Sequence, residues 1–181
     1  DLINSMEPFE QESEELEMNK NVIKDIKNNQ TEKVYEDSEW LVISPKTKEA
    51  SCFWGMGTKW CTAATEEIKN RFNSYNSRGS LYIFIDKIHK DDKGRQVKYQ
   101  FHFASRQFMD SEDNVIKNGI LHFNKTLIDV ILERTDIKEY PSGYLEFFIL
   151  CGENNIALDY IIKNEMSNAA LNWSKILNDD N

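Results

Sequence analysis

The segment Gly55–Ala63 (Gly-Met-Gly-Thr-Lys-Trp-Cys-Thr-Ala) brings a cation, a thiol and a hydroxyl together within four residues, at Lys59, Cys61 and Thr62. A thiol becomes a nucleophile when a nearby cation or helix N-terminus lowers its pKa. Lys59 is close in sequence, and a helix is expected to begin near Thr65. The two glycines allow a positive φ or a close approach to a ligand. The alternative is that Cys61 is a small buried apolar side chain, as most free cysteines are. Taken alone, the segment favours this structural role.

A second group of candidates lies on Lys98–Phe103, which has the pattern of a β-strand. Alternate side chains of a strand share a face. The aromatic side chains should therefore point into the core, and Lys98, Gln100 and His102 should point the other way. An ordinary solvated face would explain these three residues, but the mixture also suits the floor of a binding site. The aromatic set is Tyr99, Phe101 and Phe103.

Together the two segments suggest a site for nucleophilic catalysis or for anion binding. His102 is a candidate general base for Cys61 if the fold brings them together, with Asp110 or Asp86 orienting its ring. Scattered cations would hold a phosphate or carboxylate if they converge, although such side chains on surface turns are usually only solvated. The candidate catalytic residues are Cys61, His102 and Asp110. The candidate ligand-binding residues are Lys59, Thr62, Arg78, Lys98, Gln100 and Arg106.

No cofactor or metal motif is complete in the chain. Thr58 separates Gly57 from Lys59, so the segment is not a phosphate loop of the Walker A type. The three cysteines and three histidines lack zinc-finger spacing. An odd number of cysteines without a CxxC pair favours reduced thiols in a cytosolic setting. We therefore expect neither a cofactor nor a bound metal.

The charge distribution restricts the possible partners. The net charge is -9, from 31 acidic and 22 basic residues. Residues 1–18 hold seven acidic residues and no basic one, so the remainder has 24 acidic against 22 basic residues, or -2. No helix carries a basic stripe, which argues against sequence-specific DNA binding. No apolar run approaches the roughly 20 residues that span a bilayer, so no membrane partner is expected.

The hydrophobic pattern predicts an α+β fold: a small antiparallel sheet with flanking helices, followed by helices. An acidic lead-in occupies residues 1–18, the α+β module residues 19–118 and the helical region residues 119–181. Strands are expected at Lys33–Asp37, Glu39–Ser44, Leu81–Asp86, Val97–Phe103 and Gln107–Asp110, with a loop over Lys87–Gln96. Helices are expected at Asn19–Asn28, Thr47–Trp54, Thr65–Tyr75, Leu127–Arg134, Gly143–Cys151, Ile156–Lys163 and Ala169–Leu177.

Several short strings in this order resemble a module of bacteriophage and mobile-element proteins, and distantly PcfJ-like proteins. The strings are Gly57-Thr58-Lys59-Trp60-Cys61-Thr62-Ala63, Gly79-Ser80-Leu81-Tyr82, Lys98-Tyr99-Gln100-Phe101-His102-Phe103 and Gln107-Phe108-Met109-Asp110. The resemblance covers roughly Trp40 to Val115. It implies a viral origin and one joined site across these segments, and it implies no particular reaction.

Two functions therefore remain open. The first is a bacteriophage accessory or virion-associated protein that acts through a viral or host protein partner in the bacterial cytoplasm. The second is an enzyme or binding protein for a nucleotide or another small anionic ligand, dependent on Cys61 and His102 with Lys59 and Arg78 holding the anion. A buried Cys61 far from His102 would count against the enzyme, and a deep polar pocket around His102 would count against a purely structural role.

Overall fold

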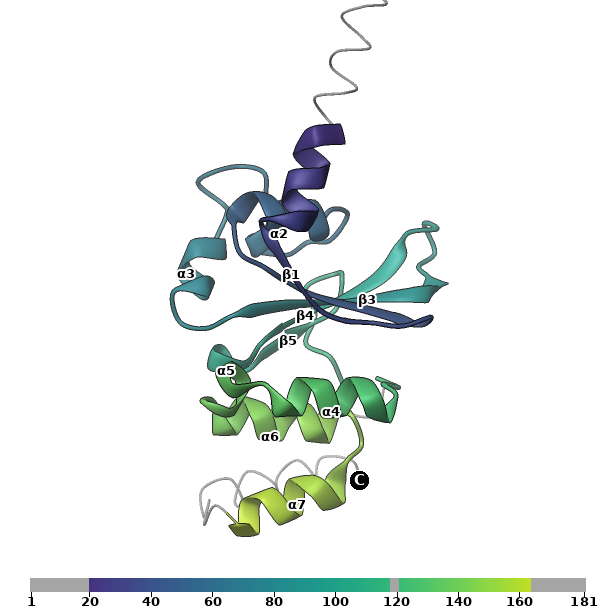
Figure 1. Cartoon of the computed structure of the whole chain (residues 1–181), viewed down its shortest axis with the longest axis vertical. Coiled ribbons are helices and arrows are strands. Elements are labelled where there is room, and N and C mark those ends of the chain that lie inside the picture. The colour runs from purple at the N-terminus through teal and green to yellow at the C-terminus, as the bar shows by residue number, and fades with distance from the viewer. Residues whose placement is uncertain (1–19, 118–120, 164–181) are drawn as a thin grey trace, which may run out of the picture.

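The chain forms one antiparallel sheet with helices on both faces, an α+β fold as predicted (Figure 1). The computed structural model describes residues 20–117 and 121–163. A helix over residues 20–28 comes first. The strands are β1 (Thr31–Glu36), β2 (Trp40–Pro45), β3 (Leu81–Lys90), β4 (Gln96–His102) and β5 (Gln107–Met109). The helices are α2 (Lys48–Trp54), α3 (Phe72–Asn76), α4 (Lys125–Glu133), α5 (Thr135–Lys138), α6 (Pro141–Leu150) and α7 (Asn154–Lys163). Short 3-10 turns occupy Cys61–Ala63 and Phe103–Ser105.

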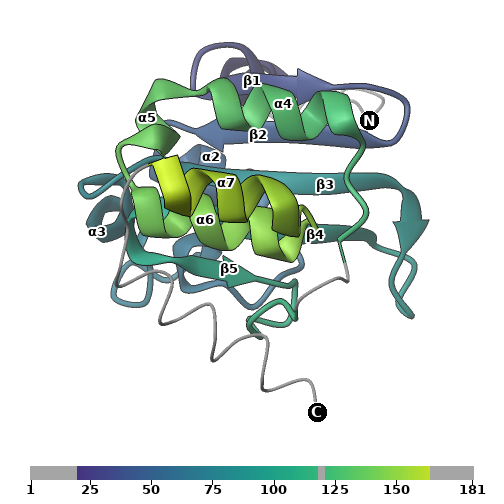
Figure 2. The same cartoon turned by 90° about the horizontal axis from the view of Figure 1, so that it is seen from below.

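The strands follow one another in the order β1-β2-β3-β4-β5, each antiparallel to the next. The short helices α2 and α3 lie on one face of this meander, and α4, α5 and α6 lie on the other (Figure 1). Seen from below, α7 lies over α6 (Figure 2). Because both faces are covered, β3 carries a continuous apolar run instead of alternating with polar residues.

The larger core lies between the sheet and the C-terminal helices. On β3, Tyr82 and Phe84 point into it, whereas Ile83 and Ile85 join a smaller core with Trp60 on the opposite face. The aromatic side chains of β4 lie as predicted: Phe101 and the following Phe103 are buried in the larger core, and Tyr99 packs against it. The larger core also takes in Phe123, Leu127 and Phe147, so α4 and α6 share one core with the sheet.

Polar contacts fix the first C-terminal helix to the sheet. Asn124 caps α4 by accepting a hydrogen bond from the Leu127 amide at 2.9 Å, and its amide donates to Asp37 beside β2 at 2.7 Å. At the other end of α4, Arg134 bonds Glu32 of β1 at 2.7 Å and the Tyr82 hydroxyl at 2.8 Å. These contacts join segments that are far apart in the sequence.

Two predicted elements are wrong in extent. The helix expected over Thr65–Tyr75 is only α3, because the Asn70 side chain bonds the carbonyl oxygens of Thr62 and Ala64 and accepts from the Phe72 amide. Such side-chain bonds offer the backbone an alternative to the helix. The loop expected over Lys87–Gln96 is shorter, because β3 continues to Lys90 and β4 begins at Gln96.

The remaining predicted strands and helices lie within a few residues of the expected bounds. The segment Ala169–Leu177 and the acidic lead-in lie outside the described residues. In the part of the chain that the structure describes, no helix has the length and apolar character needed to cross a membrane.

Gly143 permits the closest contact between α6 and the sheet. A Cβ atom at this position would lie 2.3 Å from the Phe103 carbonyl oxygen and 2.9 Å from its carbonyl carbon. Both are backbone atoms, so the helix itself would have to move. We therefore expect Gly143→Ala to destabilise the protein by about 1–3 kcal/mol, the usual cost of overpacking.

The prediction is checked by urea unfolding, with Ser142→Ala on the same helical turn as the control. Alanine is the better helix former by roughly 1 kcal/mol. Without the close contact, Gly143→Ala would therefore stabilise the protein, and that result would contradict the described packing.

Candidate functional site

The segment Gly55–Ala63 packs beside β4. The buried Thr62 hydroxyl donates a hydrogen bond to the buried Gln100 side-chain oxygen. Earlier in the segment, the Lys59 amide donates a hydrogen bond to the Ser111 carbonyl oxygen at 2.9 Å, close to the end of β5. Two members of the predicted ligand-binding set, Thr62 and Gln100, are therefore in contact, but both are buried inside the protein.

The first glycine of the segment is required by packing. A Cβ atom on Gly55 would lie 2.4 Å from the Ala63 Cβ and 2.9 Å from the Ser51 carbonyl oxygen. Gly57 has a φ of +85°, a conformation that favours glycine. The two glycines end α2 and turn the chain back against it. This turn places Trp60 against the face of the sheet that α2 covers.

Trp60 anchors the segment. Its ring is buried in the smaller core with Ile83 and Ile85, and its indole nitrogen donates to the Asp110 carbonyl oxygen at 2.6 Å. The Asp110 carboxylate accepts from the amides of Glu112 and Asn114, both at 2.9 Å. Asp110 thus shapes its own turn, and the structure does not place it against His102.

His102 is fully buried, and both ring nitrogens are occupied. Nε2 lies 3.1 Å from the carbonyl oxygens of Tyr75 and of Gly79, and Nδ1 lies 2.6 Å from the Ser105 hydroxyl. Because carbonyl oxygens only accept, Nε2 carries the hydrogen and Nδ1 accepts from Ser105. Burial lowers the pKa of His102, so the neutral ring is favoured. The ring joins the α3–β3 turn to the end of β4.

Cys61 is half-buried, and the net effect of the residues described around it opposes activation of the thiol. Burial raises the pKa of its thiol, and the charge of Asp113 raises it further. Lys59, the expected activator, forms an ion pair with Glu112 at 2.7 Å. Among the described residues neither ring nitrogen of His102 bonds Cys61, and all three cysteines are free. The other candidate orienter, Asp86, bonds His89 at 2.8 Å.

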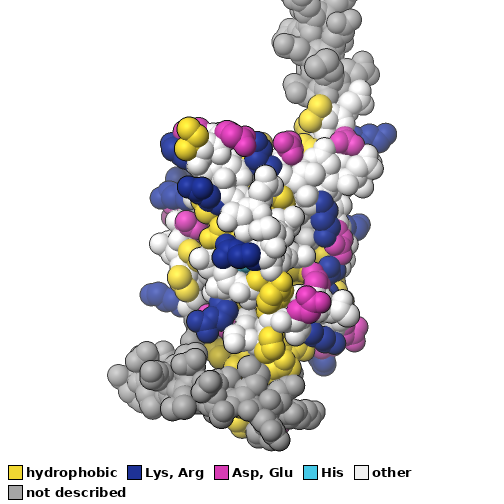
Figure 3. Space-filling model, turned by 90° about the vertical axis from the view of Figure 1, so that its left-hand side faces the viewer, with side chains coloured by type: hydrophobic (Ala, Val, Ile, Leu, Met, Phe, Trp, Pro, Cys, Tyr) yellow, Lys and Arg dark blue, Asp and Glu magenta, His cyan; other side chains and the backbone are white. Residues whose placement is uncertain are grey.

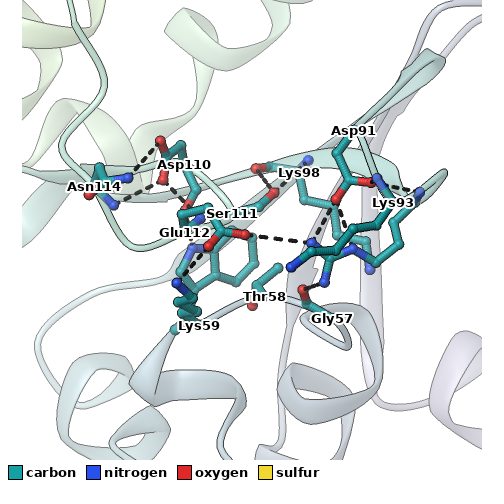
Figure 4. A network of polar contacts seen from close by, with 12 residues as sticks. Gly57, Thr58, Lys59, Asp91, Lys93, Lys98, Asp110, Ser111, Glu112 and Asn114 are labelled. Atoms are coloured by element: carbon teal, nitrogen blue, oxygen red, sulfur yellow. Dashed lines mark hydrogen bonds and ion pairs between the residues drawn. The ribbon is translucent and has the colours of Figure 1, made fainter.

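The predicted cations divide between two regions. Lys98 lies on β4 toward the β3–β4 hairpin, and Lys59 pairs with Glu112 in the nearby network (Figure 4). Arg78 lies in the α3–β3 turn, and Arg106 lies in the turn between β4 and β5, close to Tyr140 of the helical region. The expected single anion site is therefore divided.

A pocket of about 380 Å³ lies beside Lys98, between the C-terminal end of α2 and the β3–β4 hairpin. Phe53 and Trp54 supply an aromatic wall. The Lys98 ammonium donates to the carbonyl oxygens of Trp54 at 2.8 Å and Met56 at 3.0 Å. Burial lowers the pKa of Lys98, and the charge of Arg95 lowers it further. The lining residues are Phe53, Trp54, Met56, Gly57, Thr58, Ile85, Asp91, Arg95, Gln96, Lys98 and Ser111.

An ionic network forms one rim of this pocket (Figure 4). Arg95 bonds Asp91 at 2.7 Å, lies 3.5 Å from Glu112, and donates to the Gly57 carbonyl oxygen. Glu112 in turn pairs with Lys59. The hairpin, the turn after β5 and the glycine segment are thereby held together around the pocket mouth.

The sequence did not identify the aromatic wall or Arg95. Phe53 and Trp54 end a predicted helix, where an aromatic pair usually indicates core packing. Arg95 lies in a segment that was expected to be a plain loop. The one available signal was that Trp54 immediately precedes the glycine segment.

No family model matches the sequence, and no match was found among curated proteins or solved structures. Within residues 20–117 and 121–163, no group of three or more His, Cys, Asp or Glu side chains is arranged to hold a metal ion.

We expect His102→Gln to destabilise the protein by about 2–4 kcal/mol at pH 7.5, because buried hydrogen-bonding groups lose their partners. The folded state keeps His102 neutral, whereas the unfolded state takes up a proton below about pH 6.5. The stability that His102 contributes is therefore present above that pH and declines as the pH falls.

Urea unfolding of both proteins at pH 7.5 and 5.5 checks this dependence. The destabilisation caused by His102→Gln should shrink by roughly 1 kcal/mol at the lower pH. A destabilisation that stays constant or grows at pH 5.5 would show that the buried ring is not held neutral.

Proposed function

We propose that this protein is a non-catalytic binding module whose pocket beside Lys98 takes a small, flat ligand with one anionic group. A nucleoside monophosphate and an aromatic carboxylate both have this chemistry. The observation that supports the proposal most strongly is the uncompensated charge of Lys98 beside an aromatic wall.

The charge balance of the pocket favours an anion. Lys59 and Arg95 are both neutralised by carboxylates, at Glu112 and Asp91. Lys98 forms no ion pair with any residue that the structure describes, and its two hydrogen bonds go to main-chain carbonyls. An ammonium group has three donors, so one N–H remains for a ligand. A ligand anion would supply the missing counter-charge in partly desolvated surroundings, where charge pairing is stronger than in water.

The aromatic wall favours a flat ligand. Phe53 and Trp54 are perpendicular, with ring centroids 5.2 Å apart. The Lys27 ammonium lies 5.8 Å from the Phe53 ring and 6.0 Å from the Trp54 ring. This second cation lies beside the aromatic wall. Small-ligand sites are typically apolar pockets with a few polar groups that fix orientation, and this pocket has that composition.

The alternative of an enzyme dependent on Cys61 and His102 has less support. A nucleophilic cysteine needs a lowered pKa and a base within hydrogen-bond reach. Burial has the opposite effect on the Cys61 pKa, and the His102 ring is occupied by Tyr75, Gly79 and Ser105. A binding role requires neither residue to react.

The resemblance of the sequence supports a biological setting for the module. We place it as an accessory or virion-associated protein of a bacteriophage, in the cytoplasm of the bacterial host or in the particle, where it also meets a viral or host protein. The support is the order of the strings from Gly57 to Asp110.

Calorimetric titration with adenosine 5′-monophosphate, 2-naphthoate, adenosine and inorganic phosphate tests the pocket. We expect at least one of the two flat anions to bind, and adenosine and phosphate to bind at least tenfold more weakly. Lys98→Met should weaken binding at least tenfold, since a charge-assisted hydrogen bond contributes roughly 1.5–3 kcal/mol. Phe53→Leu should also weaken it, because it removes a ring while keeping an apolar side chain.

Lys125→Met is the matched control, because it removes a lysine charge that is already paired, with Asp129 on α4. Its affinity should equal that of the unaltered protein. Equal binding by Lys98→Met and Lys125→Met, or no binding of either flat anion at millimolar concentration, would refute the proposal.

A further inference from the structure

Two arginines lie near the C-terminal end of β4, at the opposite end of this strand to the pocket. Arg78 lies in the turn between α3 and β3, and Arg106 lies in the turn between β4 and β5. Both turns are at the end of the sheet drawn on the left in Figure 1, which faces the viewer in Figure 3. Figure 3 shows Lys and Arg side chains spread over the middle and left of this face. Neither arginine takes part in the pocket described above.

Arg78 is held in place while most of its guanidinium hydrogens remain available. Its guanidinium lies 4.9 Å from the centre of the Tyr75 ring, and its Nε donates to the Ser74 carbonyl oxygen at 3.1 Å. Its own carbonyl oxygen accepts from the Tyr140 hydroxyl. Among the described residues Arg78 has no carboxylate partner within 4.0 Å. Its two terminal nitrogens therefore remain for a ligand, in the planar fork that matches a carboxylate.

Arg106 is fixed through its backbone. It has φ 53° and ψ 41°, the left-handed conformation, and its amide donates to the Phe103 carbonyl oxygen at 3.2 Å. Its nearest described carboxylate is Glu146 at 3.9 Å, too far for a hydrogen bond. The side chain is 54% exposed. The Arg106 guanidinium is thus a second group with hydrogen-bond donors available for a ligand.

The surface around the two arginines is hollowed. One hollow of about 280 Å³ lies beside Arg78 and a second of about 350 Å³ lies beside Arg106, and both are lined by Glu139 and Tyr140. Serine residues line both hollows, at Ser77, Ser80, Ser105 and Ser142. A polypeptide crossing Tyr140 would therefore meet a guanidinium on each side.

We infer that this face docks a carboxylate-rich segment of a partner protein, with Arg78 and Arg106 each receiving an acidic side chain. The charge of the chain favours a short acidic peptide over a nucleic acid. Residues 19–181 carry a net charge of -2, so this part of the chain has no excess of positive charge to hold a continuous phosphate backbone. A peptide places carboxylates only where the arginines lie.

Glu139 should have the opposite effect on peptide binding to that of the two arginines. It is exposed and lines both hollows, and it forms no ion pair with any described residue. Its carboxylate must repel an acidic peptide that crosses Tyr140. Removing the charge with Glu139→Gln should therefore strengthen binding, whereas removing the arginine charges should weaken it.

Fluorescence anisotropy with a labelled ten-residue peptide of alternating Glu and Ser tests the inference at 50 mM salt, with a Gln–Ser peptide as the uncharged probe. We expect the acidic peptide alone to bind, the double variant Arg78→Gln/Arg106→Gln to weaken it at least tenfold, and Glu139→Gln to tighten it about twofold to fivefold. The matched control is Lys33→Gln/Lys125→Gln, which removes the same charge from β1 and α4 and should change the affinity less than twofold.

Three results would overturn the inference. These are no binding of the acidic peptide, equal loss in the lysine and arginine double variants, or an oligothymidylate of ten nucleotides that binds more tightly than the peptide and depends on the same arginines. Circular dichroism confirms that each variant is folded. Because Lys98 and Phe53 are unchanged in all of these variants, failure here leaves the proposed ligand pocket untouched.

Discussion

The arrangement of one face of the protein depends on the burial of polar side chains on β4. Lys98, Gln100 and His102 point to the same face of the sheet, and that face is covered by α2, α3 and the segment between them. A buried polar group without a partner costs roughly 1–3 kcal/mol, so the buried Gln100 and His102 must be bonded, and the half-buried Lys98 is bonded as well. Each is bonded to a different segment: Lys98 to the end of α2, Gln100 to Thr62, and His102 to the α3–β3 turn. β4 therefore acts as a template that fixes where three separate segments lie.

Because these side chains must be bonded, several residues that the sequence suggests as catalytic or ligand-binding have a structural role. The imidazole of His102 and the hydroxyl of Thr62 are hydrogen-bonded inside the protein, and the Trp60 indole is bonded to a backbone carbonyl. Three cations of the predicted site lie at the two ends of β4: Lys98 and Arg78 form no ion pair with a described residue, and Arg106 lies 3.9 Å from Glu146. Lys98 borders an aromatic pocket at one end, and Arg78 and Arg106 border open hollows at the other. A rigid framework with unpaired charge at its edges is suited to binding and does not require a reacting group.

The sequence predicted the parts of the fold that depend on local pattern. The apolar run of β3 and the alternation of Tyr99, Phe101 and Phe103 were sufficient to predict buried strands. The helix expected over Thr65–Tyr75 was wrong because the Asn70 side chain bonds carbonyl oxygens of a neighbouring turn. The hydrophobic periodicity of the sequence carries no information about such a bond. Lys98, Gln100 and His102 looked like either a solvated face or a site floor. Only the position of α2 and α3 shows that this face is covered. The pocket was not predicted because Phe53, Arg95 and Lys98 come together only in the folded chain.

A double-mutant cycle between Thr62 and Gln100 tests most directly whether their buried hydrogen bond holds the glycine segment on β4. Unfolding free energies would be measured for Thr62→Val, Gln100→Leu and the pair. If the buried bond holds the glycine segment on β4, each single variant leaves its former partner unbonded, and the double variant removes both groups. The coupling energy should then be at least about 1 kcal/mol. Additive effects, within about 0.3 kcal/mol, would contradict the account.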